Sequence, residues 1–136
     1  MKQSDEASRG PIYVPVSPGE LLDKLTILEI KLENITDQVK VDNVQREYAL
    51  LSGVLHRQLP DNSRISLWRE DLKRVNKKIW DVEEEIRAKE RAHDFGAEFI
   101  ELARSAYLSN DARSEIKRRI NELLNSDVTE VKSHRS

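Results

Sequence analysis

The sequence of 136 residues contains no cysteine, only four glycines and four prolines, and few aromatic residues (5%). The lack of cysteine excludes disulfides, zinc fingers, iron–sulfur clusters and a cysteine nucleophile. With so few glycines, there is no glycine-rich loop of the kind that binds phosphates. The sequence also lacks a run of about 18 apolar residues and an apolar segment near its start, so it predicts neither a membrane span nor a signal peptide. We therefore expect a cytoplasmic protein.

An excess of charge of one sign is also missing. The chain has 23 basic and 25 acidic residues and a formal charge of −2, so it has no overall field that would attract nucleic acid or an anionic membrane. The basic side chains between 64 and 78 wind around a helix instead of forming a stripe, and we expect no nucleic-acid partner. Charged residues of both signs are abundant, at 35%. This composition is typical of long helices.

The strongest local signal lies at residues 17–20. Ser17 can cap a helix, Pro18 suits the first helical position, and Glu20 can bond back to the Ser17 amide, as in a capping box. Apolar residues then follow at alternating spacings of four and three, which is a heptad pattern: Leu21, Leu25, Leu28, Leu32 and Ile35. The sequence therefore predicts a helix that begins at Pro18.

The same rhythm predicts two further helices, and two shorter ones follow. The second apolar stripe runs from Val41 to Leu55 and the third from Ile65 to Ile86. Asp94 and Asn110 each offer a cap for a short helix that would cover the end of the third. We expect an all-α fold: an antiparallel three-helix, coiled-coil-like bundle with two short C-terminal capping helices. It would form one domain over residues 12–125, between a flexible leader (1–11) and a flexible tail (126–136).

The first predicted helix has apolar residues on two faces. Ile27 and Ile30 lie opposite the heptad stripe. Either the β-rich segment 12–16 covers this second face, or the face is a self-association interface. The second alternative predicts a symmetric homodimer.

Several cations could converge where the bundle meets its cap. Two lysines stack on one border of the first helix, one arginine lies near the end of the third, and another lies in the first turn of the last predicted helix. They predict a site for an anionic ligand formed by Lys24, Lys31, Arg87 and Arg113. The alternative is that these cations pair with nearby acids, namely Glu20, Asp23, Glu90 and Asp111.

No complete catalytic or metal-binding pattern is present. Glu90 and His93 have the Glu-x-x-His spacing of di-iron bundles, but only one copy exists and two are needed. We therefore predict no metal and no cofactor. Asp81-x-x-Glu84 followed by Glu98-x-x-Glu101 has some likeness to the magnesium sites of helical nucleotide pyrophosphatases, with two of the four residue types exchanged.

Four strings carry a resemblance to a known family: PVSPGELLDKLTILEIK at 15–31, IRAKE at 86–90, FIELAR at 99–104 and NDAR at 110–113. They resemble an uncharacterised bacterial family of small helical proteins, over about residues 12–125. Members occur beside, or fused to, glycosyltransferases and cell-surface polysaccharide proteins, so the resemblance implies a link to polysaccharide assembly. It implies no particular chemistry. The polar residues that match these strings are Glu20, Asp23, Lys24, Lys31, Arg87, Glu90, Arg104, Asn110, Asp111 and Arg113.

The sequence thus favours a non-enzymatic module that binds a protein partner or an anionic ligand, because helical packing explains most residues. The alternative is a small enzyme acting on a phosphorylated or carboxylated metabolite. Such an enzyme would be similar to the pyrophosphatases or to the all-helical chorismate mutases. The segment 18–34 resembles the first helix of the chorismate mutases, but it lacks the arginine that they have early in that helix.

Overall fold

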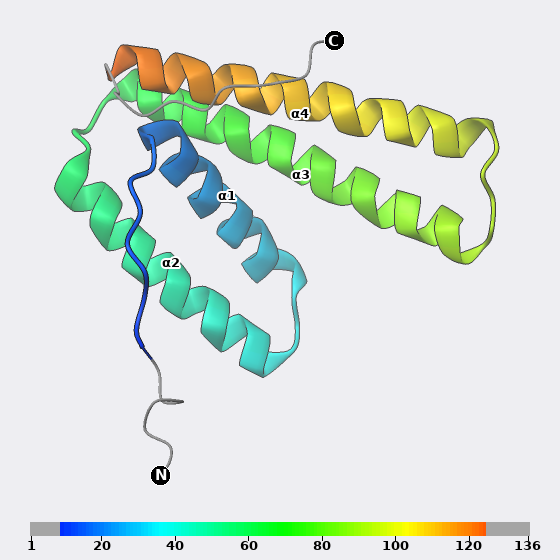
Figure 1. Cartoon of the computed structure of the whole chain (residues 1–136), viewed down its shortest axis with the longest axis horizontal. Helices are drawn as coiled ribbons and strands as arrows, with labels where there is room; N and C mark the ends of the chain where they lie inside the picture. The colour runs from blue at the N-terminus through cyan, green and yellow to red at the C-terminus, as the bar shows by residue number, and fades with distance from the viewer. Residues whose placement is uncertain (1–8, 125–136) are drawn as a thin grey trace.

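A computed structural model describes residues 9–124, which form four helices and no strand (Figure 1). The helices are α1 (Pro18–Asn34), α2 (Gln38–Gln58), α3 (Ser63–Arg91) and α4 (Ala97–Leu123). The long helices α3 and α4 form an antiparallel hairpin, and the shorter hairpin of α1 and α2 packs against one half of it. The all-α class is confirmed for this part of the chain. The predicted tail at 126–136 and most of the predicted leader lie outside the described residues.

The start of α1 follows the sequence prediction. Ser17 is the N-cap, and its Oγ accepts a hydrogen bond from the Glu20 amide at 3.1 Å, while Pro18 is the first helical residue. The second half of the expected capping box does not form. The Glu20 carboxylate accepts a hydrogen bond from Lys117 of α4 at 2.8 Å instead. The start of α1 is therefore fixed by its own cap and by a contact with the last helix.

Helix α1 is buried on two sides because it lies between α2 and the α3/α4 hairpin (Figure 1). Leu22 packs with Ile65, Leu72 and Ile120 in the core between α1, α3 and α4. Ile30 is buried as well, at 1% exposure, and lines a cavity together with α3 side chains. The second apolar face predicted for this helix is thus an internal contact with α3.

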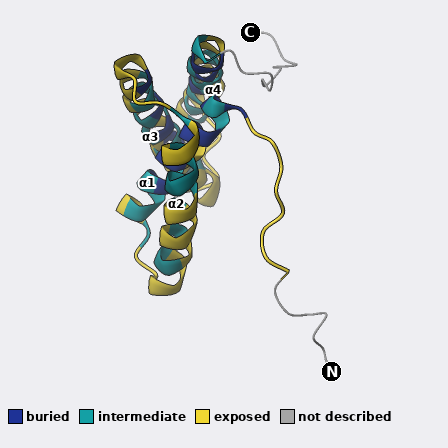
Figure 2. Cartoon of the chain, turned by 90° about the vertical axis from the view of Figure 1, so that its left-hand side faces the viewer, coloured by how far each residue is buried: buried dark blue, intermediate teal, exposed yellow. Residues whose placement is uncertain are grey.

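The segment 12–16 does not cover that face, contrary to one of the two sequence-based explanations. It has no regular secondary structure and runs away from the helices (Figure 2). Ile12 and Tyr13 are 89% and 87% exposed. Because α3 already covers Ile30, the two-faced character of α1 also gives no support to a self-association interface at this position.

One long helix, α4, replaces the two short capping helices that the sequence predicts. Asp94 lies two residues before the N-cap, Gly96, and its Oδ1 accepts a hydrogen bond from the Gly96 amide at 3.2 Å. Asn110 lies inside α4, where its side-chain amide donates to the Ala106 carbonyl at 3.1 Å. An asparagine that bonds to the preceding turn of its own helix does not end that helix. The single helix covers α3 along its length, including the part that the short helices were expected to cover (Figure 1).

Helix α2 does not pack against both of the other long helices, as a member of the predicted three-helix bundle would. Its backbone packs on α1 and makes no comparable contact with α3 or α4, and none of its residues is fully buried. The described residues therefore form two crossed hairpins instead of three helices around one seam. None of the helices in residues 9–124 combines the length and apolar character needed to cross a membrane.

Glu29 of α1 joins three helices through its carboxylate. It accepts hydrogen bonds from Tyr48 of α2 at 2.8 Å and Arg69 of α3 at 2.7 Å, and its other oxygen lies 3.3 Å from the Lys73 ammonium. Burial raises the pKa of Glu29, but the hydrogen bonds from Tyr48, Arg69 and Lys73 and the charge of Arg69 outweigh it. The pKa of Glu29 consequently lies below its ordinary value of 4.5.

Replacing Glu29 by glutamine is therefore expected to destabilise the protein at neutral pH by about 1–2 kcal/mol, because the amide cannot match a charged acceptor. A carboxyl group whose pKa is lowered by folding stabilises the protein above its unfolded pKa and loses this effect as the pH falls through the folded value. The difference between wild type and Glu29→Gln should thus be complete well above pH 4.5 and shrink below it. Urea denaturation of both proteins between pH 3 and pH 7 measures this difference, and a gap that stays constant would contradict the role given to Glu29.

Candidate functional site

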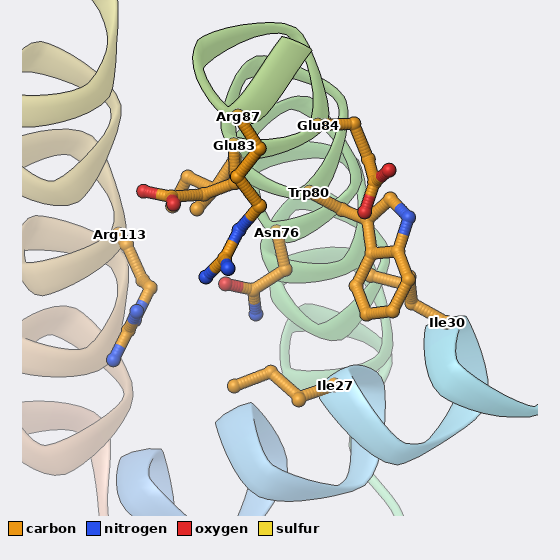
Figure 3. A pocket seen from close by; sticks show the side chains of 9 residues that line it. Ile27, Ile30, Asn76, Trp80, Glu83, Glu84, Arg87 and Arg113 are labelled. Carbon is orange, nitrogen blue, oxygen red and sulfur yellow. The ribbon is translucent and has the colours of Figure 1, made fainter. Parts of the chain in front are cut away.

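A pocket of about 390 Å³ lies where α1 crosses α3 and α4. Helix α3 supplies most of its wall, α1 supplies part of the apolar lining, and α4 contributes one arginine (Figure 3). The lining residues are Ile27, Ile30, Asn76, Ile79, Trp80, Glu83, Glu84, Arg87 and Arg113.

The α3 side chains reach one opening because of their spacing. Asn76, Trp80, Glu83 and Arg87 follow one another at intervals of four, three and four residues, which places them on one face of a helix. The lower turns of this face carry Asn76 and Trp80 beside α1, and the upper turns carry charged residues. The pocket is therefore apolar where α1 and α3 meet and charged toward solvent.

Buried polar groups adjoin the apolar part of the pocket. Asp23 and Thr26 of α1 and Asn76 of α3 are at most 5% exposed. The Asn76 side-chain amide donates to Asp23 Oδ1 at 2.8 Å and lies 2.9 Å from Thr26 Oγ1. Asn76 thus links the buried face of α1 to the wall of the pocket.

Lys117 of α4 lies in the same interior region, with a side chain that is only 3% exposed. Its ammonium is 2.8 Å from Glu20 Oε2 and 3.7 Å from Asp23 Oδ2. Burying charges is costly unless opposite charges and hydrogen bonds compensate them. We refer to Asp23, Thr26, Asn76, Arg113 and Lys117 as the polar junction of α1, α3 and α4.

A glycine allows α1 to approach α4 closely at this junction. The Gly19 amide donates to Asn121 Oδ1 at 2.8 Å. A Cβ atom at residue 19 would lie 2.6 Å from the Lys117 carbonyl oxygen, which is too close for any side chain. The string Ser-Pro-Gly-Glu therefore combines a helix cap, a docking point for α4 and one partner of Lys117.

The two arginines of the pocket have different surroundings. Arg113 is held in place: its Nε is 3.3 Å from Asp23 Oδ1, and one of its terminal nitrogens donates to Asn110 Oδ1 at 3.3 Å. Arg87 is exposed and forms no hydrogen bond or ion pair with any residue from 9 to 124. Its guanidinium group points into the opening, above Asn76 and on the side that faces Arg113 (Figure 3).

Two carboxylates flank Arg87 without pairing with it. Glu83 and Glu84 are exposed and form no ion pair within the described part of the chain. Glu83 is directed toward α4, whereas the Glu84 carboxylate is directed to the other side (Figure 3). Glu84 follows Trp80 by four residues, so the two residues are neighbours on the same face of α3.

The structure brings two of the four predicted anion-binding cations to the pocket and leaves two outside. Arg87 and Arg113 line it, whereas Lys24 is exposed, Lys31 is half-buried, and neither lines it. The sequence predicts that Arg113 lies in the first turn of a helix. This prediction is wrong, because α4 is continuous through this position. Its guanidinium group, and not a free helix end, therefore reaches the pocket.

The other polar residues of the family-like strings, which the sequence suggests as supporting residues of the anion site, have separate roles. Glu20 pairs with Lys117 and not with Lys24, while Asp23 pairs with Arg113 and Lys117. Of the remaining supporting residues, Asn110 contacts Arg113, Arg104 pairs with Glu101 at 3.3 Å, Glu90 is exposed and Asp111 is half-buried.

The carboxylates of the pyrophosphatase-like pattern do not gather. Asp81 pairs with Lys77 at 3.2 Å and Glu98 with Lys89 at 3.4 Å, on the flanks of their helices. Among residues 9–124, no group of three or more His, Asp or Glu side chains is placed to hold a metal ion.

Several residues of the site were not identified from the sequence, among them Asn76, Trp80 and Lys117. The spacing of Asn76 and Trp80 relative to Arg87 is visible in the sequence and could have indicated a shared face. No comparable signal exists for Lys117, because its partners lie in α1, about 95 residues earlier in the chain.

The chain belongs to a family of unknown function, DUF6165, whose family model matches residues 12–136. The resemblance to a family without an assigned function is thereby confirmed. The match begins at Ile12, so it includes the exposed segment before α1. No curated protein and no solved structure gives a significant match.

Proposed function

We propose that this member of the family is a non-enzymatic binding module, which takes a small molecule by its anionic group in the pocket between α1, α3 and α4. One observation carries the proposal. Arg87 has no partner among the described residues, and its guanidinium group faces the pocket that Arg113 lines from the opposite helix.

The two arginines complement each other as ligand-binding groups. A guanidinium group is planar and always charged, and it presents donors that match a carboxylate or a phosphate. The contacts of Arg113 with Asp23 and Asn110 fix its position before a ligand arrives. Arg87 is available to move onto the ligand and to close the charged side of the pocket.

The remaining walls indicate that the ligand has an apolar part. Ile27, Ile79 and Trp80 line the pocket together with the arginines. A volume of about 390 Å³ falls within the usual range of about 300–1,000 Å³ for small-molecule sites. We therefore expect a compact ligand with an apolar body and an anionic head.

Two features favour a binding module over an enzyme. The buried charges of the polar junction compensate one another, as in the contacts of Lys117 with Glu20 and Asp23. Lys24 and Arg87 are both exposed, whereas catalytic groups are commonly desolvated so that their pKa values shift.

The test is calorimetric titration of the protein with 3-phenylpropionate and phenyl phosphate. We expect Arg87→Ala to weaken binding of the better of these ligands at least tenfold. The matched control is Arg91→Ala, because Arg91 is an exposed arginine of α3 that does not line the pocket. Arg87→Ala should not unfold the protein, since the side chain has no partner among residues 9–124. Binding should also weaken as salt is raised.

Two results would overturn the proposed function. One is that neither of these compounds binds and that analogues carrying an added amino group do not bind either. The other is that Arg87→Ala binds as well as wild type, which would place the ligand elsewhere.

The biological setting and the assembly state form the second part of the proposal. The resemblance of residues 15–31 to a family found beside glycosyltransferases supports a role in cell-surface polysaccharide assembly. The exposed apolar residues Ile12, Tyr13 and Val14, which the family match includes, support a homodimer or a protein partner.

A further inference from the structure

Carboxylates as well as arginines surround the pocket, and this limits the kinds of ligand that fit. Arg87 and Arg113 are accompanied by the carboxylates of Asp23, Glu83 and Glu84. Asp23 lies against Arg113 and compensates its charge. As far as residues 9–124 are concerned, the opening therefore presents one unpaired cation, Arg87, and two unpaired carboxylates, Glu83 and Glu84.

Arg87 does not pair with Glu83 or Glu84, although their positions along α3 would allow an ion pair. Glu83 and Glu84 precede Arg87 by four and three residues, an arrangement in which acidic and basic side chains on a helix commonly pair. Neither carboxylate pairs with Arg87, and Figure 3 shows them directed to opposite sides of it. The opening thus has a cationic centre with an acidic group on each side.

The Glu84 side of the opening suits a cation. Glu84 and Trp80 both line the pocket, and they are neighbours on one face of α3 because they are four residues apart. A carboxylate attracts an ammonium group directly, and the face of a tryptophan attracts one through its π electrons. Both features are found on the wall that also carries the apolar lining.

From this arrangement we infer that the ligand is a zwitterion, with a carboxylate that binds Arg87 and an ammonium group that binds Glu84 and Trp80. This inference rests on the proposed function, because it assumes that an anionic group binds Arg87. A ligand with a negative charge alone would meet two unpaired carboxylates in the same opening. Amino acids with an apolar or aromatic side chain, and their close analogues, have the required chemistry.

The experiment compares ligands that differ only in the ammonium group. One pair is phenylalanine and 3-phenylpropionate, in which the amine is next to the carboxylate. The other pair is 4-(aminomethyl)phenylacetate and 4-methylphenylacetate, in which the amine lies across the ring. By calorimetry, we expect the amino compound of at least one pair to bind wild type about tenfold more tightly than its partner.

The advantage of the amino compound should disappear in Glu84→Gln. It should persist in Glu85→Gln, a neighbouring exposed glutamate of α3 that does not line this pocket. Equal binding of the two members in both pairs would overturn the inference, as would an advantage that Glu84→Gln leaves intact.

The outcomes also separate the inference from the proposed function. If 3-phenylpropionate binds and Arg87→Ala abolishes its binding, the anion site stands even when the amine adds nothing. If none of the compounds binds, both ideas fail.

Discussion

Replacing Lys117 by methionine is expected to lower the free energy of unfolding by about 3–5 kcal/mol. The methionine side chain has a similar length but cannot compensate the carboxylates of Glu20 and Asp23, which lie 2.8 and 3.7 Å from the Lys117 ammonium. Asp23 is 1% exposed, so water cannot replace the lost partner. Equilibrium denaturation in urea, followed by circular dichroism, measures the loss.

Two further variants show whether the loss comes from the buried charge. Lys78→Met is the matched control, because Lys78 is exposed on α3 and has no partner in the described part of the chain. It should change the stability by less than about 0.5 kcal/mol. The double variant Asp23→Asn with Lys117→Met should be less destabilised than the sum of its single variants. A loss below about 1 kcal/mol in Lys117→Met would mean that the junction does not depend on this charge.

Replacing Leu28 by alanine is expected to cost about 2–5 kcal/mol. Leu28 is 3% exposed and belongs to the heptad stripe of α1. Since α1 lies between two layers of helices, its backbone has little freedom to close a new cavity. The control is Leu50→Ala, the same truncation at a residue of α2 that is 55% exposed. Urea denaturation should show at most a small effect there, and equal effects at the two positions would contradict the central position of α1.

The fold was predictable where short-range signals decide it. The Ser17 cap and the heptad spacing are local properties of the sequence, and they placed the first three helices correctly. Asn110 shows the limit, because asparagine can cap a helix or bond to the preceding turn of one, and only the packing of α4 along α3 selects the second. Periodicity also reveals that α1 has two apolar faces without showing which helix covers each.

The site was predictable only in part, for a related reason. Arg87 and Arg113 stand out as cations in two of the family-like strings, and the structure brings them to one pocket. Lys24 and Lys31 are equally prominent in the sequence, yet they do not line this pocket. Whether a charge is paired, buried or free depends on residues far away in the sequence, such as Asp23 for Arg113. A single sequence does not contain that information.

The long hairpin has a further consequence for local unfolding. The buried residues of α3 end at Val82 and those of α4 begin at Ser109, so no residue in the half between them is fully buried. Segments with few buried contacts open at a lower free energy than the whole protein. The tip of the hairpin should therefore open and close while the half against α1 stays folded. The pocket residues Trp80 and Arg87 lie on either side of this boundary, so a bound ligand would extend the rigid part of the hairpin and slow the opening of its tip.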